Sequence, residues 1–193
     1  MSSSDAIALL EVASIAQGIF LCDAIVKRAP VRFLRTEAVS PGKFLVLFTG
    51  DVASVQESYT EALELAEGEL VDAFFLPHVH EAVVPAIAGA PGAASVDALG
   101  IYECHTVAAG ILAADKALKA ADVALIEFKT AKGIGGKAYF TLTGSQTEVE
   151  AALDAADEVC EEARTRVRRV VIPNPHEDFM PVVLPALGAN LRT

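Results

Sequence analysis

Apolar and polar residues along the first half of the chain change their spacing in a fixed order. Residues 6–13 form a short apolar run of strand length, and over residues 15–26 apolar side chains recur every three to four positions until a proline ends the run. Residues 31–39 and 43–49 are rich in β-forming side chains and are separated only by Ser-Pro-Gly. This order predicts a strand, then a helix, then a β-hairpin.

A second helical stripe follows the predicted hairpin. Apolar residues recur at helical spacing over residues 55–66, and Asp51 stands before them as an N-cap candidate. Residues 70–76 have the composition of a fourth strand. The pattern β, α, β, β, α, β predicts an α+β fold of the ferredoxin-like kind, in which a small antiparallel sheet packs against helices.

The second half of the chain repeats the first. Six residues find an identical partner 92 positions later: Glu11/Glu103, Gly18/Gly110, Asp23/Asp115, Lys27/Lys119, Ala29/Ala121 and Val31/Val123. The offset grows to 94 at Gly42/Gly136 and to 96 at His80/His176. Because the offset grows only in predicted loops, the repeat predicts two similar domains, residues 1–93 and 94–193, joined by the Gly- and Pro-containing segment 88–95. In the second copy, Ser145 and Glu148 predict a capping box at a helix start.

Composition and charge exclude several classes of function. Residues 82–96, a long stretch poor in charge, contain prolines and glycines and fall short of the roughly 20 apolar residues that span a bilayer. The first residues lack the basic and apolar regions of a secretory signal, so we expect a cytosolic location. The formal net charge of −11 argues against general binding to nucleic acid, and the basic segment 164–169 is interpreted as a solvated or interface patch.

The three cysteines do not form a recognisable metal or disulfide motif. Cys22, Cys104 and Cys160 are odd in number and lack Cys-x-x-Cys spacing, which argues against a disulfide framework and against a zinc site. We expect buried thiols at these positions.

The repeated motifs resemble those of the bacterial microcompartment shell domain. In the first half they are the Asp-Ala-x-x-Lys run at residues 23–27, the Pro-Gly-Lys turn at 41–43 and the Pro-x-x-His ending at 77–80. Related motifs lie in the second half at residues 115–119, 133–137 and 173–176. The resemblance covers nearly the whole chain. It is to the tandem, non-permuted shell proteins of the propanediol-utilisation type, because the first strand precedes the first helix in each copy.

This resemblance implies a structural protein rather than an enzyme. Three chains would supply six similar domains to a homotrimer that mimics a hexamer and leaves one pore on its axis for small metabolites. Such trimers would tile edge to edge with other shell proteins in the cytoplasm and meet enclosed enzymes, without binding nucleic acid or a membrane.

The resemblance also implies which residues line the pore, since in this family the turn between the second and third strands faces the axis. The residues concerned are Val39, Ser40, Pro41, Gly42, Gly133, Ile134, Gly135 and Gly136. Glycines there permit close backbone approach and expose N–H groups to polar solutes. An ordinary glycine-rich hairpin is the alternative interpretation. Lys132, beside the second turn, would either bias the pore toward anions or remain a solvated lysine.

Some members of this family carry a cysteine where Ser40 stands and thereby hold an iron–sulfur cluster on the axis. A serine hydroxyl is a poor ligand for such a cluster, so we expect no metal and no cofactor here.

Four residues are expected at the edge of the tile. Lys27 and Lys119 end the first helix of each copy, the position that lies at the edge in this family. The alternative is a lysine that only complements the helix dipole. The family often has arginine just after the last strand, where this chain has His78 and Asn174.

No residues of the chain form a convincing catalytic set. His80 and His176 occupy matching positions after prolines and are interpreted as hydrogen-bonding residues of a turn. The glycine-rich segment 133–137 lacks the spacing of a phosphate-binding loop and precedes a predicted strand, not a helix. Two alternative functions remain: a trimeric protein that binds a small regulatory molecule, and an electron carrier with an iron–sulfur cluster at the pore.

Overall fold

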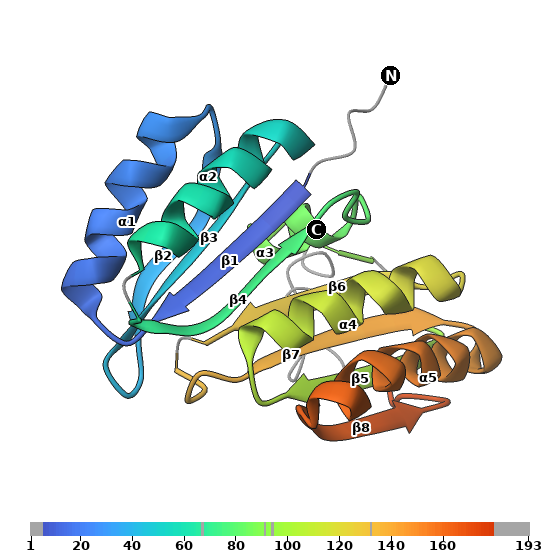
Figure 1. Cartoon of the computed structure of the whole chain (residues 1–193). Helices are drawn as coiled ribbons and strands as arrows, with labels where there is room; N and C mark the ends of the chain where they lie inside the picture. The colour runs from blue at the N-terminus through green and yellow to red at the C-terminus, as the bar shows by residue number, and fades with distance from the viewer. Residues whose placement is uncertain (1–5, 67, 91, 94, 132, 180–193) are drawn as a thin grey trace. The chain divides into compact units, whose positions relative to one another are not determined.

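A computed structural model describes residues 6–66, 68–90, 92–93, 95–131 and 133–179. The chain divides into two compact units, Met1–Val84 and Pro85–Thr193, which repeat the same order of strands and helices (Figure 1). Ala93 N–H donates to the carbonyl of Leu125 at 3.0 Å, a contact within the second unit. The domain boundary expected between residues 93 and 94 stays a prediction.

The first unit contains a four-stranded sheet and two long helices. Its elements are β1 (Ala6–Val12), α1 (Ile15–Arg28), β2 (Arg32–Val39), β3 (Lys43–Gly50), α2 (Val52–Leu65) and β4 (Leu70–Leu76), with the short α3 (Val83–Ile87) at the division between the units. The strands lie in the order β2-β3-β1-β4, and every neighbouring pair is antiparallel. The predicted α+β fold is therefore confirmed for this half.

The core of the first unit lies between the sheet and the two long helices, which Figure 1 shows side by side over β1 and β3. Every residue of β1 is buried, on both faces of the sheet. This explains why the strand appears in the sequence as an apolar run interrupted only by Glu11, and not as an alternating pattern. One face of the sheet packs with the helices through a cluster that includes Leu10, Val46, Phe48, Leu21 and Ile25.

The second unit has the same architecture. Its elements are β5 (Ala98–Cys104), α4 (Val107–Ala120), β6 (Ala124–Thr130), β7 (Ala138–Gly144), α5 (Gln146–Ala163) and β8 (Arg166–Ile172). The strand order is β6-β7-β5-β8, again antiparallel throughout. Tyr102 and Phe128 stack on either side of Phe140, with ring centroids 5.3 and 6.1 Å from that of Phe140.

Side chains cap the N-termini of all four long helices. Asp51 accepts a hydrogen bond from Ser54 N–H at 3.0 Å, as predicted, and Ser14 and Thr106 cap α1 and α4 in the same way. Ser145 caps α5. The Glu148 carboxylate, however, accepts from the Asp122 N–H at 2.8 Å. The predicted capping box is therefore confirmed only for Ser145, and Glu148 ties the start of α5 to the turn that follows α4.

Among the helices that the structure describes, none has both the length and the apolar content needed to cross a membrane.

Candidate functional site

The β2–β3 turn presents three of its four candidate residues to solvent. Ser40, Pro41 and Gly42 are exposed, and the Gly42 N–H donates to the Val39 carbonyl at 2.9 Å. Gly42 has a φ of +104°, which an L-residue rarely adopts. Val39 differs from its neighbours, because its side chain is only 5% exposed. Its side chain packs inside this chain, so at the turn it contributes backbone only.

The β6–β7 loop is longer and is closed by backbone hydrogen bonds. Ala131 N–H donates to the Lys137 carbonyl at 2.8 Å, and the Ala131 carbonyl accepts from the N–H groups of Ile134 and Gly136 at 3.3 Å. Gly133, Gly135 and Gly136 all have positive φ. A Cβ added at Gly133 or Gly135 would meet nothing within 4 Å, so backbone conformation, not crowding, requires glycine there. Lys132 lies outside the described residues.

An ion pair stands at the base of each hairpin, on the sheet face away from the long helices. Lys43 Nζ lies 2.7 Å from Glu11 Oε1, and Lys137 Nζ lies 2.8 Å from Glu103 Oε1. The Glu11 side chain is 6% exposed, whereas that of Glu103 is 36% exposed. Sequence analysis matched these residues between the copies but did not predict that they pair. Both pairs tie a lysine at the start of β3 or just before β7 to the neighbouring inner strand, β1 or β5.

The candidate edge lysines form a second duplicated ion pair. Lys27 lies 2.5 Å from Asp23, and Lys119 lies 2.7 Å from Asp115, each with an i, i+4 spacing on its own helix. This spacing explains the Asp-x-x-x-Lys motif physically, because residues four apart share one helix face and an acid before a base agrees with the helix dipole. Both lysines are exposed.

The residues that follow the last strand of each unit are exposed as well. His78 and Asn174 lie on the surface, and His78 has a φ of +56°. His80 and His176 perform the predicted turn role, since Nδ1 of each ring accepts from the N–H two residues later, of Ala82 at 3.3 Å and of Asp178 at 3.2 Å. No cluster of three or more potential metal ligands occurs in the described part of the chain.

The exposed apolar residues of α1 are matched by buried residues of α4. Ile15, Ile19, Phe20 and Val26 are 40–59% exposed. At the same positions of the second copy, Val107, Ile111 and Leu118 are at most 6% exposed and Leu112 is half-buried. The two helices therefore carry similar apolar side chains but differ in whether these are covered.

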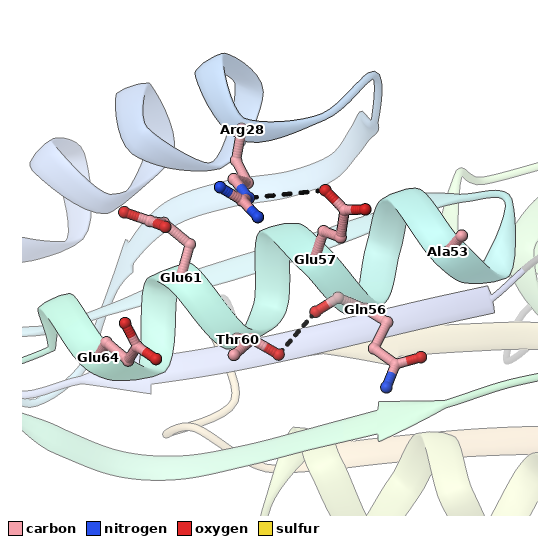
Figure 2. A pocket seen from close by; sticks show the side chains of 7 residues that line it. All are labelled: Arg28, Ala53, Gln56, Glu57, Thr60, Glu61 and Glu64. Carbon is pink, nitrogen blue, oxygen red and sulfur yellow. Dashed lines mark hydrogen bonds and ion pairs between the residues drawn. The ribbon is translucent and has the colours of Figure 1, made fainter.

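A groove of about 500 Å³ runs between the end of α1 and the outer face of α2 (Figure 2). Arg28 Nε lies 3.6 Å from Glu57 Oε2, and Glu61 and Glu64 extend the acidic side. The residues that line the groove include no histidine, cysteine or serine, and the Thr60 hydroxyl donates to the Gln56 carbonyl at 2.9 Å. It is an open, acidic helix surface, and its side chains suggest no chemistry.

Two of the three thiols lie together in the second unit, which sequence analysis did not predict. Cys104 on β5 and Cys160 on α5 are both fully buried, and their Sγ atoms are 3.6 Å apart. Cys22 on α1 is only partly buried. The expectation of buried thiols is thus confirmed for Cys104 and Cys160 and only partly for Cys22.

The chain thus contains two consecutive domains of the same βαββαβ topology. The ion pair at the base of the hairpin and the ion pair at the end of the first helix occur in both, so this is a tandem-domain protein. The sequence model of the BMC domain matches residues 6–79 and 98–175, so the chain belongs to the BMC domain family and carries two such domains in tandem.

The chain is similar to known microcompartment proteins along almost its whole length. It is 43% identical to the bacterial microcompartment shell protein PduT of Citrobacter freundii over 176 residues, which cover 91% of this chain and 96% of that protein. A crystal structure of a microcompartment protein from Desulfitobacterium hafniense DCB matches with a TM-score of 0.85 and 43% identity, over 90% of this chain and 97% of that one.

A more distant structural match shows the fold alone. The fused permuted hexameric shell protein MSM0275 from the RMM microcompartment aligns with a TM-score of 0.64 at 22% identity, over 85% of this chain and 87% of that protein.

Proposed function

We propose that the chain is a structural shell protein of a bacterial microcompartment, and that three copies form a tile with an axial pore. The observation that carries the proposal is the 43% identity to a shell protein, which extends over 91% of this chain and 96% of the relative.

The uneven burial of α1 and α4 supports assembly with further copies of the chain. Four large apolar side chains that are about half exposed along one helix are typical of an interaction surface. Since the same face is covered on α4, the simplest cover for Ile19 and Phe20 is the second unit of another copy. A head-to-tail contact of this kind either closes into a ring or grows into a filament. Three chains with six similar domains give the closed ring.

The two turns are suited to line the axis of such a ring. In the β2–β3 turn we assign the side chains of Ser40 and Pro41 and the backbone of Val39 and Gly42, and in the β6–β7 loop we assign residues 133–136. Their exposed, glycine-rich backbone would offer polar groups to small metabolites in transit. This role is passive transport, and we propose no catalysed reaction.

The residues of these turns do not fit an iron–sulfur cluster. Ser40 offers a hydroxyl, where a cluster needs thiolates. The three thiols lie on α1, β5 and α5, and none is on either turn. We therefore assign no cofactor to the pore.

We assign tile-edge contacts to Lys27, Lys119, His78 and Asn174, which are all exposed. Each lysine is already oriented by an aspartate one turn earlier, so its ammonium is positioned at the helix end and still accessible to a carbonyl of a neighbouring tile.

Native mass spectrometry with electron microscopy tests the assembly. The purified protein should have the mass of three chains and form flat arrays, and a monomer would contradict the tile. Ile19→Glu should break the trimer, because it adds a charge to the apolar face of α1. Gln56→Glu, on the exposed face of α2, adds the same charge elsewhere and should leave the trimer intact.

Replacing the edge lysines separates tiling from trimer formation. Lys27→Ala with Lys119→Ala should weaken the arrays and preserve the trimer. Lys116→Ala, which removes another exposed lysine of α4, is the control. Arrays that survive the double change would disprove the edge assignment without affecting the trimer.

A further inference from the structure

A pair of thiols lies in the core of the second unit, with no role in the proposed pore or tile edge. Cys104 ends β5 and Cys160 lies in the last turn of α5, and the two Sγ atoms approach to 3.6 Å. They are 56 residues apart in sequence, so only the packing of α5 on β5 brings them together.

Polar side chains surround this pair. The Tyr102 hydroxyl donates to Asp157 Oδ1 at 2.9 Å, and Arg166 Nη1 lies 2.9 Å from Asp157 Oδ2. The Thr165 hydroxyl oxygen is buried and has no hydrogen-bond partner of ordinary geometry among the described residues. A hydrogen bond from Cys104 lowers the pKa of the Cys160 thiol against the opposing effect of burial, and Thr165 and Tyr102 act in the same direction as Cys104.

The first unit provides an internal comparison for this cluster. At the positions of Tyr102, Cys104, Asp157 and Cys160 it has Leu10, Val12, Leu63 and Ala66, as the aligned strands and helix starts show. Those four residues belong to its apolar core or pack against it. The same fold therefore forms without thiols, tyrosine or carboxylate at these positions, so folding alone does not require the cluster.

We propose that Cys104 and Cys160 form a peroxide-sensitive dithiol site that closes into an intramolecular disulfide. The Cys160 thiolate attacks one oxygen of hydrogen peroxide, so that an S–O bond forms, the O–O bond breaks and hydroxide leaves as water after taking up a proton. The resulting sulfenic acid on Cys160 is then attacked by Cys104 sulfur as its thiol proton departs. The S–S bond forms, the S–O bond breaks and a second water leaves.

Overall, two thiols and one hydrogen peroxide give one disulfide and two waters, and the peroxide accepts the two electrons. The buried Thr165 hydroxyl lies on the Cys160 side of the pair, where it favours the thiolate, and it can also donate to the sulfenic oxygen. A small-molecule thiol would reverse the reaction by reducing the disulfide.

The oxidant reaches the buried pair through the end of α5. Arg164 caps this helix in the left-handed conformation with a φ of +51°, and Thr165 N–H donates to the Cys160 carbonyl at 2.9 Å. Helix ends open locally at lower cost than a protein core, and hydrogen peroxide is close to water in size. Opening of the last turn of α5 is therefore enough to expose Cys160.

Tryptic peptide mapping tests the proposal directly. Trypsin cleaves after lysine and arginine and places the three cysteines in separate peptides, residues 1–27, 44–116 and 138–164. The full-length protein, reduced and then freed of reductant, is treated with hydrogen peroxide and alkylated before digestion. The disulfide-linked pair 44–116 with 138–164 should form at least about tenfold faster than Cys22 is oxidised, since Cys22 has a raised pKa and no partner thiol.

Matched variants keep the test independent of folding and of shell assembly. Cys104→Val and Cys160→Ala introduce the residues that the first unit has at the same positions, so each variant should fold. Cys104→Val should still form sulfenic acid on Cys160, more slowly because the activating hydrogen bond is lost, and should retain it for detection with a dimedone probe. Cys22→Ser should form the linked peptides at the wild-type rate. If Cys22 reacts first, or if no linked pair forms in folded protein, the proposal is wrong whether or not the chain builds a shell.

Discussion

A close approach between α4 and β7 in the second unit predicts a specific double-mutant result. A Cβ added at Gly110 would lie 2.6 Å from the Ala138 Cβ, which belongs to the first residue of β7 after the β6–β7 loop. Carbon atoms in van der Waals contact are about 3.5–4.0 Å apart. Gly110→Ala therefore requires α4 and β7 to move about 1 Å further apart.

The magnitude follows from two opposing effects. Alanine in place of a helical glycine stabilises by about 1 kcal/mol. Overpacking a well-filled contact costs about 1–3 kcal/mol, and the Ala138 Cβ is fixed to the backbone and cannot rotate away. We therefore expect Gly110→Ala to destabilise the protein by about 1 kcal/mol, and Gly110→Ala with Ala138→Gly, which moves the methyl group across the contact, to recover most of the loss.

Urea unfolding followed by far-UV circular dichroism measures the cycle, with the wild type, both single variants and the double variant at one protein concentration. The coupling energy should be about 1–2 kcal/mol in favour of the double variant. If Gly110→Ala is as stable as the wild type, or if Ala138→Gly does not rescue it, the close packing of α4 on β7 is not as described. Gly18 and Phe44 make the equivalent contact in the first unit.

Three further predictions concern the hairpin bases, the loop and the thiols. Lys43→Met should lower the free energy of unfolding by about 1–3 kcal/mol, because Glu11 is left buried without its partner. Lys137→Met should cost less than about 1 kcal/mol, since that pair is more exposed. Thermal unfolding would rank the two variants, and equal losses would contradict the role of burial. Gly135→Ala should cost about 1 kcal/mol through its positive φ, with the same assay as the check. Because the Cys104 hydrogen bond lowers the pKa of Cys160 below that of an ordinary thiol, the rate of disulfide formation should fall from pH 7 to pH 5 as the thiolate is protonated. A rate that is flat with pH would contradict a thiolate attack.

The order of elements could be predicted from the sequence because the apolar spacing is set by local geometry. The run at residues 6–13, the stripe ahead of Pro30 and the Ser-Pro-Gly turn all correspond to observed elements, β1, α1 and the β2–β3 turn. The N-caps at Asp51 and Ser145 were equally local, since a cap involves a residue and the helix that it starts.

Contacts between distant segments could not be predicted in the same way. The Glu11–Lys43 pair depends on the antiparallel register of β1 and β3, and the Cys104–Cys160 contact depends on how α5 is rotated on β5. A repeat identifies equivalent residues but does not say which of them touch. The buried side chain of Val39 was missed for a related reason, because the last residue of a strand can face the core even where the next residue faces solvent.

The thiol cluster shows what gene fusion adds to a ring of similar subunits. In a ring of six identical chains, any substitution appears six times or not at all, and a core that tolerates it once must tolerate it everywhere. The proposed trimer places Val12 and Ala66 in three domains and Cys104 with Cys160 in the other three. The proposed thiol oxidation is then confined to every second domain of the ring, while the other domains keep a purely structural interior. Duplication thus frees one half of the chain to diverge while the other preserves the geometry of the ring.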